Sequence, residues 1–523
     1  MKSTALPIFR SNSSYRRQVV VLIIGSTLIR LILGYFQKLG NDEQYYLTFT
    51  VYPEINHFDH APIIELFIRL LTFDSLFDNK LILRTGSIVL AGFNTWIIYR
   101  ITCKIKDEAA GWYAALFYTF SIYGSIIIGI SIIPETVQLF FWLLCISLMV
   151  DFLPARVIDK KERLKMILFG CFVSLAILSK YSSAFIWLST ISFIMIFNRK
   201  WLRELSLYTS LFISFFFILP ILNWKLEYDW PGFSLLTETI NFSHINWNHF
   251  FNEILYGAWY VNPFNLLLIV IPLVSIFRGK ILLDSHLTAL FLLTTLPLYI
   301  TSVFFLFFNI NWLFSAGPVF ITLSIPAAVY WSDKIREMDG GVKQTLLSLY
   351  ALGSILVIAP YVFNYQSRPE QKLNLATTSF AEFDIVKDFQ GWTSIREGFQ
   401  IIANKEEAKG NMPLNSDLIA SVSFPCAHEA YYVAHPMQRK LFLLSDKDDT
   451  MMMRNNVRIG GLKNGQDYYY ITISTIYENS KELLEDHFDK IELIDTIRIT
   501  PSYAFKRYSS YALVYRVKTF QQE

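Results

Sequence analysis

The stretch VVVLIIGSTLIRLILGYF, residues 19–36, decides the fold, because Arg30 is its only charged residue. A helix that crosses a bilayer needs roughly 20 mostly apolar residues. Arg16 and Arg17 precede the stretch, and no small-residue cleavage site follows it. We therefore predict a retained first membrane helix rather than a signal peptide.

Similar apolar stretches recur through the first two thirds of the chain. We predict about 11 spans, near residues 19–36, 81–99, 110–130, 136–153, 166–179, 183–197, 205–221, 252–276, 286–308, 312–331 and 344–363. The composition agrees, with 53% hydrophobic and 17% charged residues. It excludes a disordered chain and a coiled coil. The predicted fold class is a multi-span α-helical membrane protein.

The basic residues predict the orientation, because lysine and arginine collect in cytoplasmic loops. One alternate set of loops holds roughly 20 of them and the other set roughly 4, which puts the N-terminus in the cytoplasm. An odd number of spans then puts the C-terminal part outside. The net charge of +3 is too even to suggest a nucleic-acid partner. The four cysteines form no disulfide framework.

The composition becomes polar after Tyr365, so we predict a membrane body over 1–365 and an outer domain over 366–523. Strand-like runs occur at 417–423, 440–444, 467–474, 491–499 and 510–518, and helix-like runs near 380–390, 395–408 and 480–487. This mixture predicts a small α/β domain. It has neither a phosphate-binding glycine loop nor zinc spacing, which favours a scaffold or a lid.

Two predicted outer loops, 37–80 and 222–251, are long, and long loops are often functional. The first begins with the adjacent acids Asp42 and Glu43, which we expect to point in different directions. One would face a cavity and the other make a structural bond, or both would be solvated. Residues 62–72 predict an amphipathic helix in the membrane interface.

His57, Asp59 and His60 precede this helix. Histidine and aspartate are metal ligands, but their spacing matches no standard zinc pattern. The simpler interpretation is a helix start, with Asp59 as its cap and Pro62 in its first turn. Such a helix start would also suit a phosphate.

Asp42-Glu43-x-Tyr45-Tyr46, followed by Phe58-Asp59-His60-Ala61-Pro62, resembles the first outer loop of glycosyltransferase family 39. That family includes bacterial relatives of protein mannosyltransferases and the lipid A aminoarabinose transferases. Further segments resemble the family's motifs in the same order: Ile133-Pro134-Glu135, Leu178-Ser179-Lys180-Tyr181-Ser182, Asn223-Trp224, Asp229-Trp230, Asn311-Trp312, Gly317-Pro318 and Phe389-Gln390-Gly391-Trp392. Glu135 stands where the family usually has aspartate. Residues beyond about 400 fit only loosely.

The resemblance implies the GT-C fold, with an active site at the outer face of a bacterial inner membrane and a periplasmic C-terminal domain. It implies inverting transfer of a sugar from a polyprenyl monophosphate to a glycolipid, glycan or protein. Asp42 would be the general base, and Glu43 would support it or bind the acceptor. Glu135 would orient the acceptor or the sugar. The cation Lys180 would stabilise the leaving phosphate, with Arg30 and His60 as further contacts.

The remaining substrate-binding residues expected from the family motifs and the outer-face aromatics are Tyr45, Tyr46, Asp59, Tyr181, Trp224 and Trp312. Membrane lipid is a further expected partner. We expect no cofactor. The first outer loop has no D-x-D motif, which favours a reaction that is independent of metal, although a divalent metal is still possible as an alternative. Three alternatives remain: a polyprenyl-diphosphate glycan ligase or polymerase, a secondary transporter and a non-catalytic scaffold. A transporter would require internal repeats and midplane charges, and the acids lie in outer loops instead.

Overall fold

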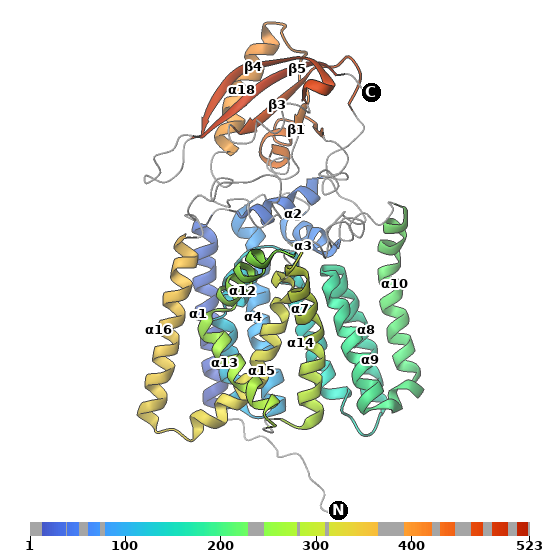
Figure 1. Ribbon diagram of the computed structural model, residues 1–523, viewed down its shortest axis with the longest axis vertical. Helices are drawn as coiled ribbons and strands as arrows, with labels where there is room; N and C mark the ends of the chain where they lie inside the picture. Colours follow the sequence, from blue (N-terminus) through green and yellow to red (C-terminus); the bar gives the residue numbers. More distant parts are fainter. Residues whose placement is uncertain are drawn as a thin grey trace, which may run out of the picture. The chain divides into compact units, whose positions relative to one another are not determined.

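The computed structural model (Figure 1) describes residues 13–37, 39–51, 61–73, 79–227, 245–279, 283–308, 313–364, 392–420, 429–444, 462–473, 484–499 and 510–520. The chain forms two compact units. The helical unit comprises Met1–Gln37, Leu81–Leu219 and Glu238–Phe363, and the sheet unit comprises Lys38–Lys80, Pro220–Thr237 and Asn364–Glu523. The sheet unit therefore takes in most of the predicted first outer loop, although the division predicted from composition lay at residue 365.

The helical unit is built from long helices joined by short turns (Figure 1). Its elements are α1 (Ser13–Phe36), α4 (Lys80–Ile105), α5 (Glu108–Thr119), η1 (Tyr123–Ile127), α6 (Ile128–Ile130), α7 (Pro134–Phe152), α8 (Lys160–Ser179), η2 (Tyr181–Ala184), α9 (Phe185–Phe197), η3 (Arg199–Arg203), α10 (Leu205–Glu227), α12 (Trp247–Val261), α13 (Pro263–Phe277), α14 (Ser285–Leu306), η4 (Leu313–Ala316), α15 (Gly317–Arg336) and α16 (Gly340–Asn364).

Each predicted span overlaps one of these helices or a bent pair of them. Among the described residues, six helices are long and apolar enough to cross a membrane, and two bent pairs raise the number to eight. The other predicted spans lie on α8, α9 and α15. α8 starts with a charged run, α9 is short, and α15 is largely buried within the protein. The predicted class, a multi-span helical membrane protein with a strand-containing C-terminal part, is confirmed.

Two of the predicted spans are sharply bent. α12 and α13 meet at 97°, and α5 meets the η1–α6 segment at 73°. The first bend falls at Asn262, whose φ of 75° lies in the left-handed region that ends a helix. Pro263 follows as the first residue of α13, where its missing N–H is tolerated. The span predicted over 252–276 is therefore interrupted near its middle.

Side-chain amides link the two bends. Asn262 Nδ2 donates to Phe120 O at 2.9 Å, and Asn265 Nδ2 donates to Phe117 O at 2.8 Å. Both carbonyls belong to the C-terminal end of α5, where the last carbonyls have no partner within the helix. Water is scarce at this depth, so protein groups must satisfy them. We call these four residues the amide clamp.

Four of the predicted basic loops lie together at one end of the helical unit. Ion pairs connect them: Lys106–Asp333 at 3.0 Å, Arg336–Asp107 at 2.5 Å, Lys104–Asp151 at 3.0 Å and Arg163–Glu204 at 2.7 Å. α7 runs toward this end and α8 starts from it. The first residues of α7 and the last residues of α8 therefore lie at the opposite end.

The sheet unit contains the helices α2 (Asn41–Val51), α3 (Ile63–Thr72), α18 (Trp392–Ala408) and the π-helical turn η6 (Ala430–Ala434). Its strands are β1 (Leu418–Ala420), β2 (Leu441–Leu443), β3 (Tyr468–Ile473), β4 (Phe488–Ile499) and β5 (Ser510–Phe520), in the order β2-β1-β3-β5-β4. β1 pairs in parallel with β2 and β3, whereas β5 pairs antiparallel with β3 and β4. All five predicted strands and the helix predicted at 395–408 are present. The helix predicted near 380–390 lies outside the described residues.

Side chains alternate along each strand, so every strand contributes side chains to both faces of the sheet. Both faces are covered. Tyr469 and Ile471 of β3 pack with α18 and η6 on one face, while Tyr468 and Tyr470 belong to a second cluster on the other. Gly398 allows α18 to approach the sheet, since a Cβ there would lie 2.8 Å from Ile497 Cγ2.

A buried ion pair joins α18 to the segment before β2. Arg439 Nη2 lies 2.7 Å from Glu407 Oε1, with side-chain exposures of 3% and 6%. The Arg439 guanidinium also donates to Ser416 O at 2.5 Å. It lies 5.6 Å from the ring centroids of both Phe399 and Tyr469. Both terminal nitrogens of the guanidinium are thus hydrogen-bonded, while its Nε has no hydrogen-bond partner among the described residues.

Glu429, just before η6, is also buried, and its Oε1 has no hydrogen-bond partner among the described residues. Burial raises the pKa of this carboxyl well above its usual value. Its contribution to stability is therefore fully present below the pKa of the unfolded chain and is lost as the pH rises. Glutamine does not ionise, so the Glu429→Gln variant is expected to lack this pH-dependent loss of stability. The Tm of the variant minus the Tm of the wild type is therefore expected to increase between about pH 5 and pH 8. Thermal unfolding of the full-length protein measures it, and a Tm difference independent of pH would contradict the prediction.

Candidate active site

The two predicted acids of the first outer loop lie at the start of α2 and have different environments. Glu43 is 1% exposed, and its Oε2 accepts a hydrogen bond from Gly40 N at 2.7 Å. A glutamate at the third helical position often closes the helix start in this way. Asp42 is exposed. The two side chains differ in exposure, in line with the expectation that they point differently, and Glu43 makes a structural bond.

The tyrosines that follow pack within the sheet unit. Tyr45 and Tyr46 make edge-to-face contacts with Phe49, with ring centroids 5.0 and 5.6 Å apart. Tyr46 is 6% exposed, while Tyr45 is half-buried and packs against the cluster that contains Val433. Their predicted stacking on a sugar or a prenyl group stays a prediction.

The amphipathic helix predicted over 62–72 is present as α3. Pro62 occupies the position before the helix rather than its first turn. Glu65 is buried, and its carboxylate lies 3.5 Å from Arg69 one turn later. The expected cap Asp59, together with His60, lies outside the described residues, as does Trp312. Trp224 is half-buried near the end of α10.

Arg30, predicted as a phosphate contact, is 1% exposed inside the helical unit. Its Nε and Nη2 donate to Ser125 O and Oγ, each at 3.0 Å, and its Nη1 donates to Ser26 Oγ at 3.2 Å. Ser125 belongs to the π-helical turn η1, and such turns often mark functional sites. Arg30 thus supports this turn with neutral partners, and its phosphate role stays a prediction.

Sequence analysis missed a second buried arginine. Arg84 of α4 is 2% exposed and donates to Gly34 O at 2.9 Å and to Gln37 O at 3.0 Å. It thereby satisfies carbonyls at the end of α1. The sequence signal for Arg84 was a charged residue within a predicted apolar span.

Glu135 and Lys180 form a direct ion pair at the end of the helical unit opposite the basic loops. Glu135 lies in the first turn of α7, after Pro134, and its side chain is 6% exposed. Lys180 follows the last residue of α8 in extended conformation, and its side chain is 22% exposed. An acid at a helix N-terminus and a base at a helix C-terminus both complement the helix dipoles. The structure thus joins two residues that the sequence analysis had treated separately.

Gln138, which the sequence analysis missed, holds the segment after Lys180. Its Nε2 donates to Ser182 Oγ and Ser183 Oγ, each at 2.9 Å. Gln138 lies one turn beyond Glu135 and so on the same side of α7. Tyr181, the first residue of η2, is half-buried. We call Glu135, Gln138, Lys180, Ser182 and Ser183 the α7–α8 cluster. The sequence signal for Gln138 was a pair of polar residues three positions apart on an otherwise apolar helix.

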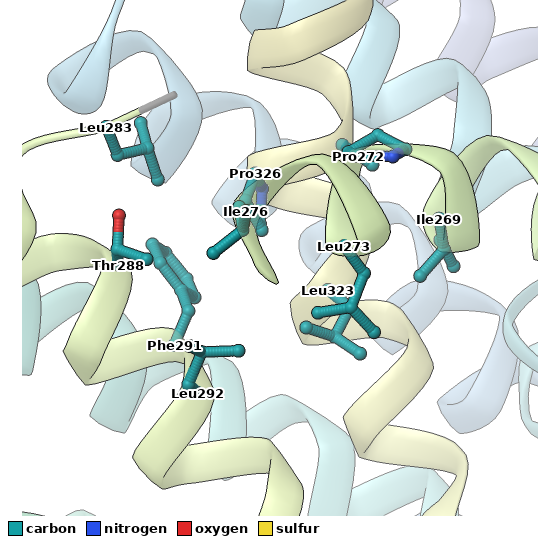
Figure 2. A pocket seen from close by; sticks show the side chains of 11 residues that line it. Ile269, Pro272, Leu273, Ile276, Leu283, Thr288, Phe291, Leu292, Leu323 and Pro326 are labelled. Carbon is teal, nitrogen blue, oxygen red and sulfur yellow. The ribbon is translucent and has the colours of Figure 1, made fainter. Parts of the chain in front are cut away.

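The described residues contain no group of three His, Cys, Asp or Glu side chains that could hold a metal ion. They do contain a small apolar pocket between α13, α14 and α15 (Figure 2). Its lining includes Leu273, Phe291 and Leu323, and Figure 2 shows Thr288 as the one labelled side chain with an oxygen. A sugar needs several polar partners, so this pocket does not suit one.

Comparisons with known proteins support the predicted resemblance. Residues 59–224 match the family model described as dolichyl-phosphate-mannose-protein mannosyltransferase, a stretch that includes the whole α7–α8 cluster. No curated protein matches the sequence.

Two solved structures are similar to the chain. The first is ArnT from Cupriavidus metallidurans, bound to undecaprenyl phosphate, with TM-score 0.58, 11% identity, and coverage of 95% of this chain and 98% of ArnT. The second is the archaeal oligosaccharyltransferase AglB from Archaeoglobus fulgidus, in complex with an inhibitory peptide and a dolichol-phosphate. It has TM-score 0.51 and 10% identity, and the match covers 90% of this chain and 71% of AglB. At such identities the similarity establishes the fold alone. It confirms the predicted GT-C fold, and the family match confirms the resemblance to family 39.

Proposed function

We propose that this chain, a family-39-like membrane glycosyltransferase with the GT-C fold, moves a sugar with inversion from a polyprenyl monophosphate to a glycolipid, glycan or protein acceptor. The observation that carries the proposal is the cation Lys180 in the α7–α8 cluster, within the family-matched residues. A departing lipid phosphate needs such a fixed cation. The structures of ArnT and AglB, which hold undecaprenyl phosphate and a dolichol-phosphate, add support for a polyprenyl-phosphate ligand.

The reaction assigns one role to each charged group. The acceptor hydroxyl or amine attacks the anomeric carbon while the Asp42 carboxylate takes its proton. The bond from the anomeric carbon to the phosphate oxygen breaks, and its electron pair stays on that oxygen. The Lys180 ammonium stabilises the charge that develops there. Glu43 supports the helix that presents Asp42.

We further propose that the protein lies in a bacterial inner membrane with the basic loops in the cytoplasm. The joined basic loops at one end of the helical unit support this orientation through the positive-inside rule. Lys180 then lies toward the periplasm. Nucleotide sugars are cytoplasmic, so a lipid-linked donor suits a reaction on that side.

The test is transfer of labelled sugar by the reconstituted full-length protein. A panel of polyprenyl-monophosphate sugars is compared with polyprenyl-diphosphate glycans and nucleotide sugars. Transfer from a monophosphate donor is the expected result. Transfer from diphosphate donors alone would replace the proposal with a glycan ligase. Absence of transfer despite lipid binding would favour a scaffold.

Lys180→Met is expected to lower transfer by about 10²–10³-fold, the usual effect of removing one group that stabilises a developing oxyanion. It is also expected to weaken binding of the carrier lipid. Lys104→Met is the matched control, because Lys104 is likewise ion-paired but lies among the basic loops at the opposite end. Equal losses in the two variants would show a general effect on folding and remove the assigned role.

A further inference from the structure

We propose that Glu135 is an internal competitor for the lipid phosphate: it holds Lys180 between turnovers and reclaims it to expel the product polyprenyl phosphate. This inference rests on the proposed function and adds a release step at the same site. It also changes the role of Glu135, which the family resemblance had assigned to orienting the acceptor or the sugar.

The ion pair carries the inference. The Glu135 carboxylate contacts the Lys180 ammonium directly, so one of the three ammonium donors is already engaged. A phosphate oxygen has the same charge and the same acceptor chemistry as a carboxylate oxygen. The lipid phosphate must therefore compete with Glu135 for the cation.

The two side chains differ in burial in the way that an exchange of Lys180 from Glu135 to the phosphate requires, because the lysine is the more exposed. Lys180 is 22% exposed, whereas Glu135 is 6% exposed. The lysine follows the end of α8 in extended conformation, outside the helix, and Gln138 anchors the serines after it. The lysine side chain is thus the more accessible of the two to a ligand, while the carboxylate belongs to the first turn of α7.

Because of its position, Glu135 can lose contact with Lys180 without becoming a buried charge that nothing stabilises. A carboxylate that loses its cation in a buried site is strongly destabilised. Glu135 lies in the first turn of α7, where the helix dipole favours a negative charge. The dipole lowers the cost of the state in which Lys180 has moved to the phosphate.

The chemistry of the reaction explains why a competitor is useful. The donor phosphate is a diester with one negative charge. The product is a monoester, whose second pKa is about 6, so it carries nearly two charges at neutral pH. A lone lysine would hold the product more tightly than the donor. Return of the Glu135 carboxylate to Lys180 weakens the hold on the product and so favours its release.

The experiment measures binding of unglycosylated undecaprenyl phosphate to full-length protein in nanodiscs, together with steady-state transfer. Glu135→Gln is expected to tighten binding by about fivefold, the upper effect of a partly exposed ion pair. The same variant is expected to lower both kcat and the KM for the donor. Glu204→Gln is the control, since it removes a carboxylate from the Arg163 ion pair at the basic end and leaves binding unchanged.

A purely structural role for Glu135 predicts the opposite result, because loss of the pair would loosen the site and weaken lipid binding. Weaker or unchanged binding by a Glu135→Gln protein that retains the wild-type Tm therefore overturns the inference. If this variant does not fold, Glu135→Asp provides the test: its shorter side chain weakens the pair, and tightening in the same direction is expected. Unchanged binding of undecaprenyl phosphate by the Lys180→Met variant would instead overturn the role of Lys180 as a phosphate contact, and with it that part of the proposed function.

Discussion

The Asp42→Asn variant is expected to transfer sugar about 10²–10⁴-fold more slowly than the wild type, which is the usual contribution of a general base. Asparagine keeps the size of the side chain but cannot take the acceptor proton. Asp42 is exposed at the start of α2, whereas Glu43 beside it is buried and bonded to Gly40 N. We therefore propose Asp42, rather than Glu43, as the group that meets a substrate. Steady-state transfer and carrier-lipid binding are measured together, and binding is expected to persist.

Two control variants separate loss of the base from loss of the helix. Glu43→Gln retains a side-chain oxygen for Gly40 N, so transfer is expected to stay within a few-fold of the wild type. Asp495→Asn changes an exposed aspartate on β4 and should have no effect. Wild-type turnover by Asp42→Asn, with a large loss in Glu43→Gln, would move the base to Glu43 and require α2 to rearrange.

The Arg439→Met variant is expected to lose about 3–5 kcal/mol of stability in the sheet unit, the usual effect of breaking a buried ion pair from one side. Methionine fills part of the space between Phe399 and Tyr469 but leaves the Glu407 carboxylate buried without its cation. Hydrogen exchange in the full-length protein measures the change, with the largest loss of protection expected in α18 and β3.

The double variant Arg439→Met, Glu407→Gln tests the cause. If the unpaired charge is responsible, neutralising Glu407 should restore most of the lost stability. Equal destabilisation of the single and double variants would assign the effect to lost packing instead. Lys490→Met, which removes an exposed partner of Glu492 on β4, is expected to change stability by less than about 1 kcal/mol.

Much of the fold could be predicted because it depends on local pattern. The spans follow from apolar composition, and the strands of the sheet unit follow from runs of β-branched and aromatic residues. The bends at residues 120–122 and at Asn262 could not be predicted in this way. Apolar composition continues across both, and the clamp bonds join residues 142 and 148 positions apart.

The candidate site was predictable in its residue types and less so in its contacts. Arg30 was expected to contact the leaving phosphate, and in the structure it contacts protein through Ser26 and Ser125. The pairing of Glu135 with Lys180 depends on how α7 and α8 pack, which composition does not encode. Gln138 and Arg84 stand out as polar residues within apolar spans, but their partners are hydroxyl and backbone oxygens, which carry no sequence signature.

The amide clamp has a consequence for how the protein is made. α12 and α13 together satisfy the length and hydropathy of one span, so an insertion machinery can accept them as a single apolar segment. The carbonyls that Asn262 and Asn265 bind belong to a helix synthesised much earlier. The bend is therefore completed by assembly of helices already in the membrane, after insertion itself. The final shape of this span thus depends on contacts with a helix that was synthesised earlier.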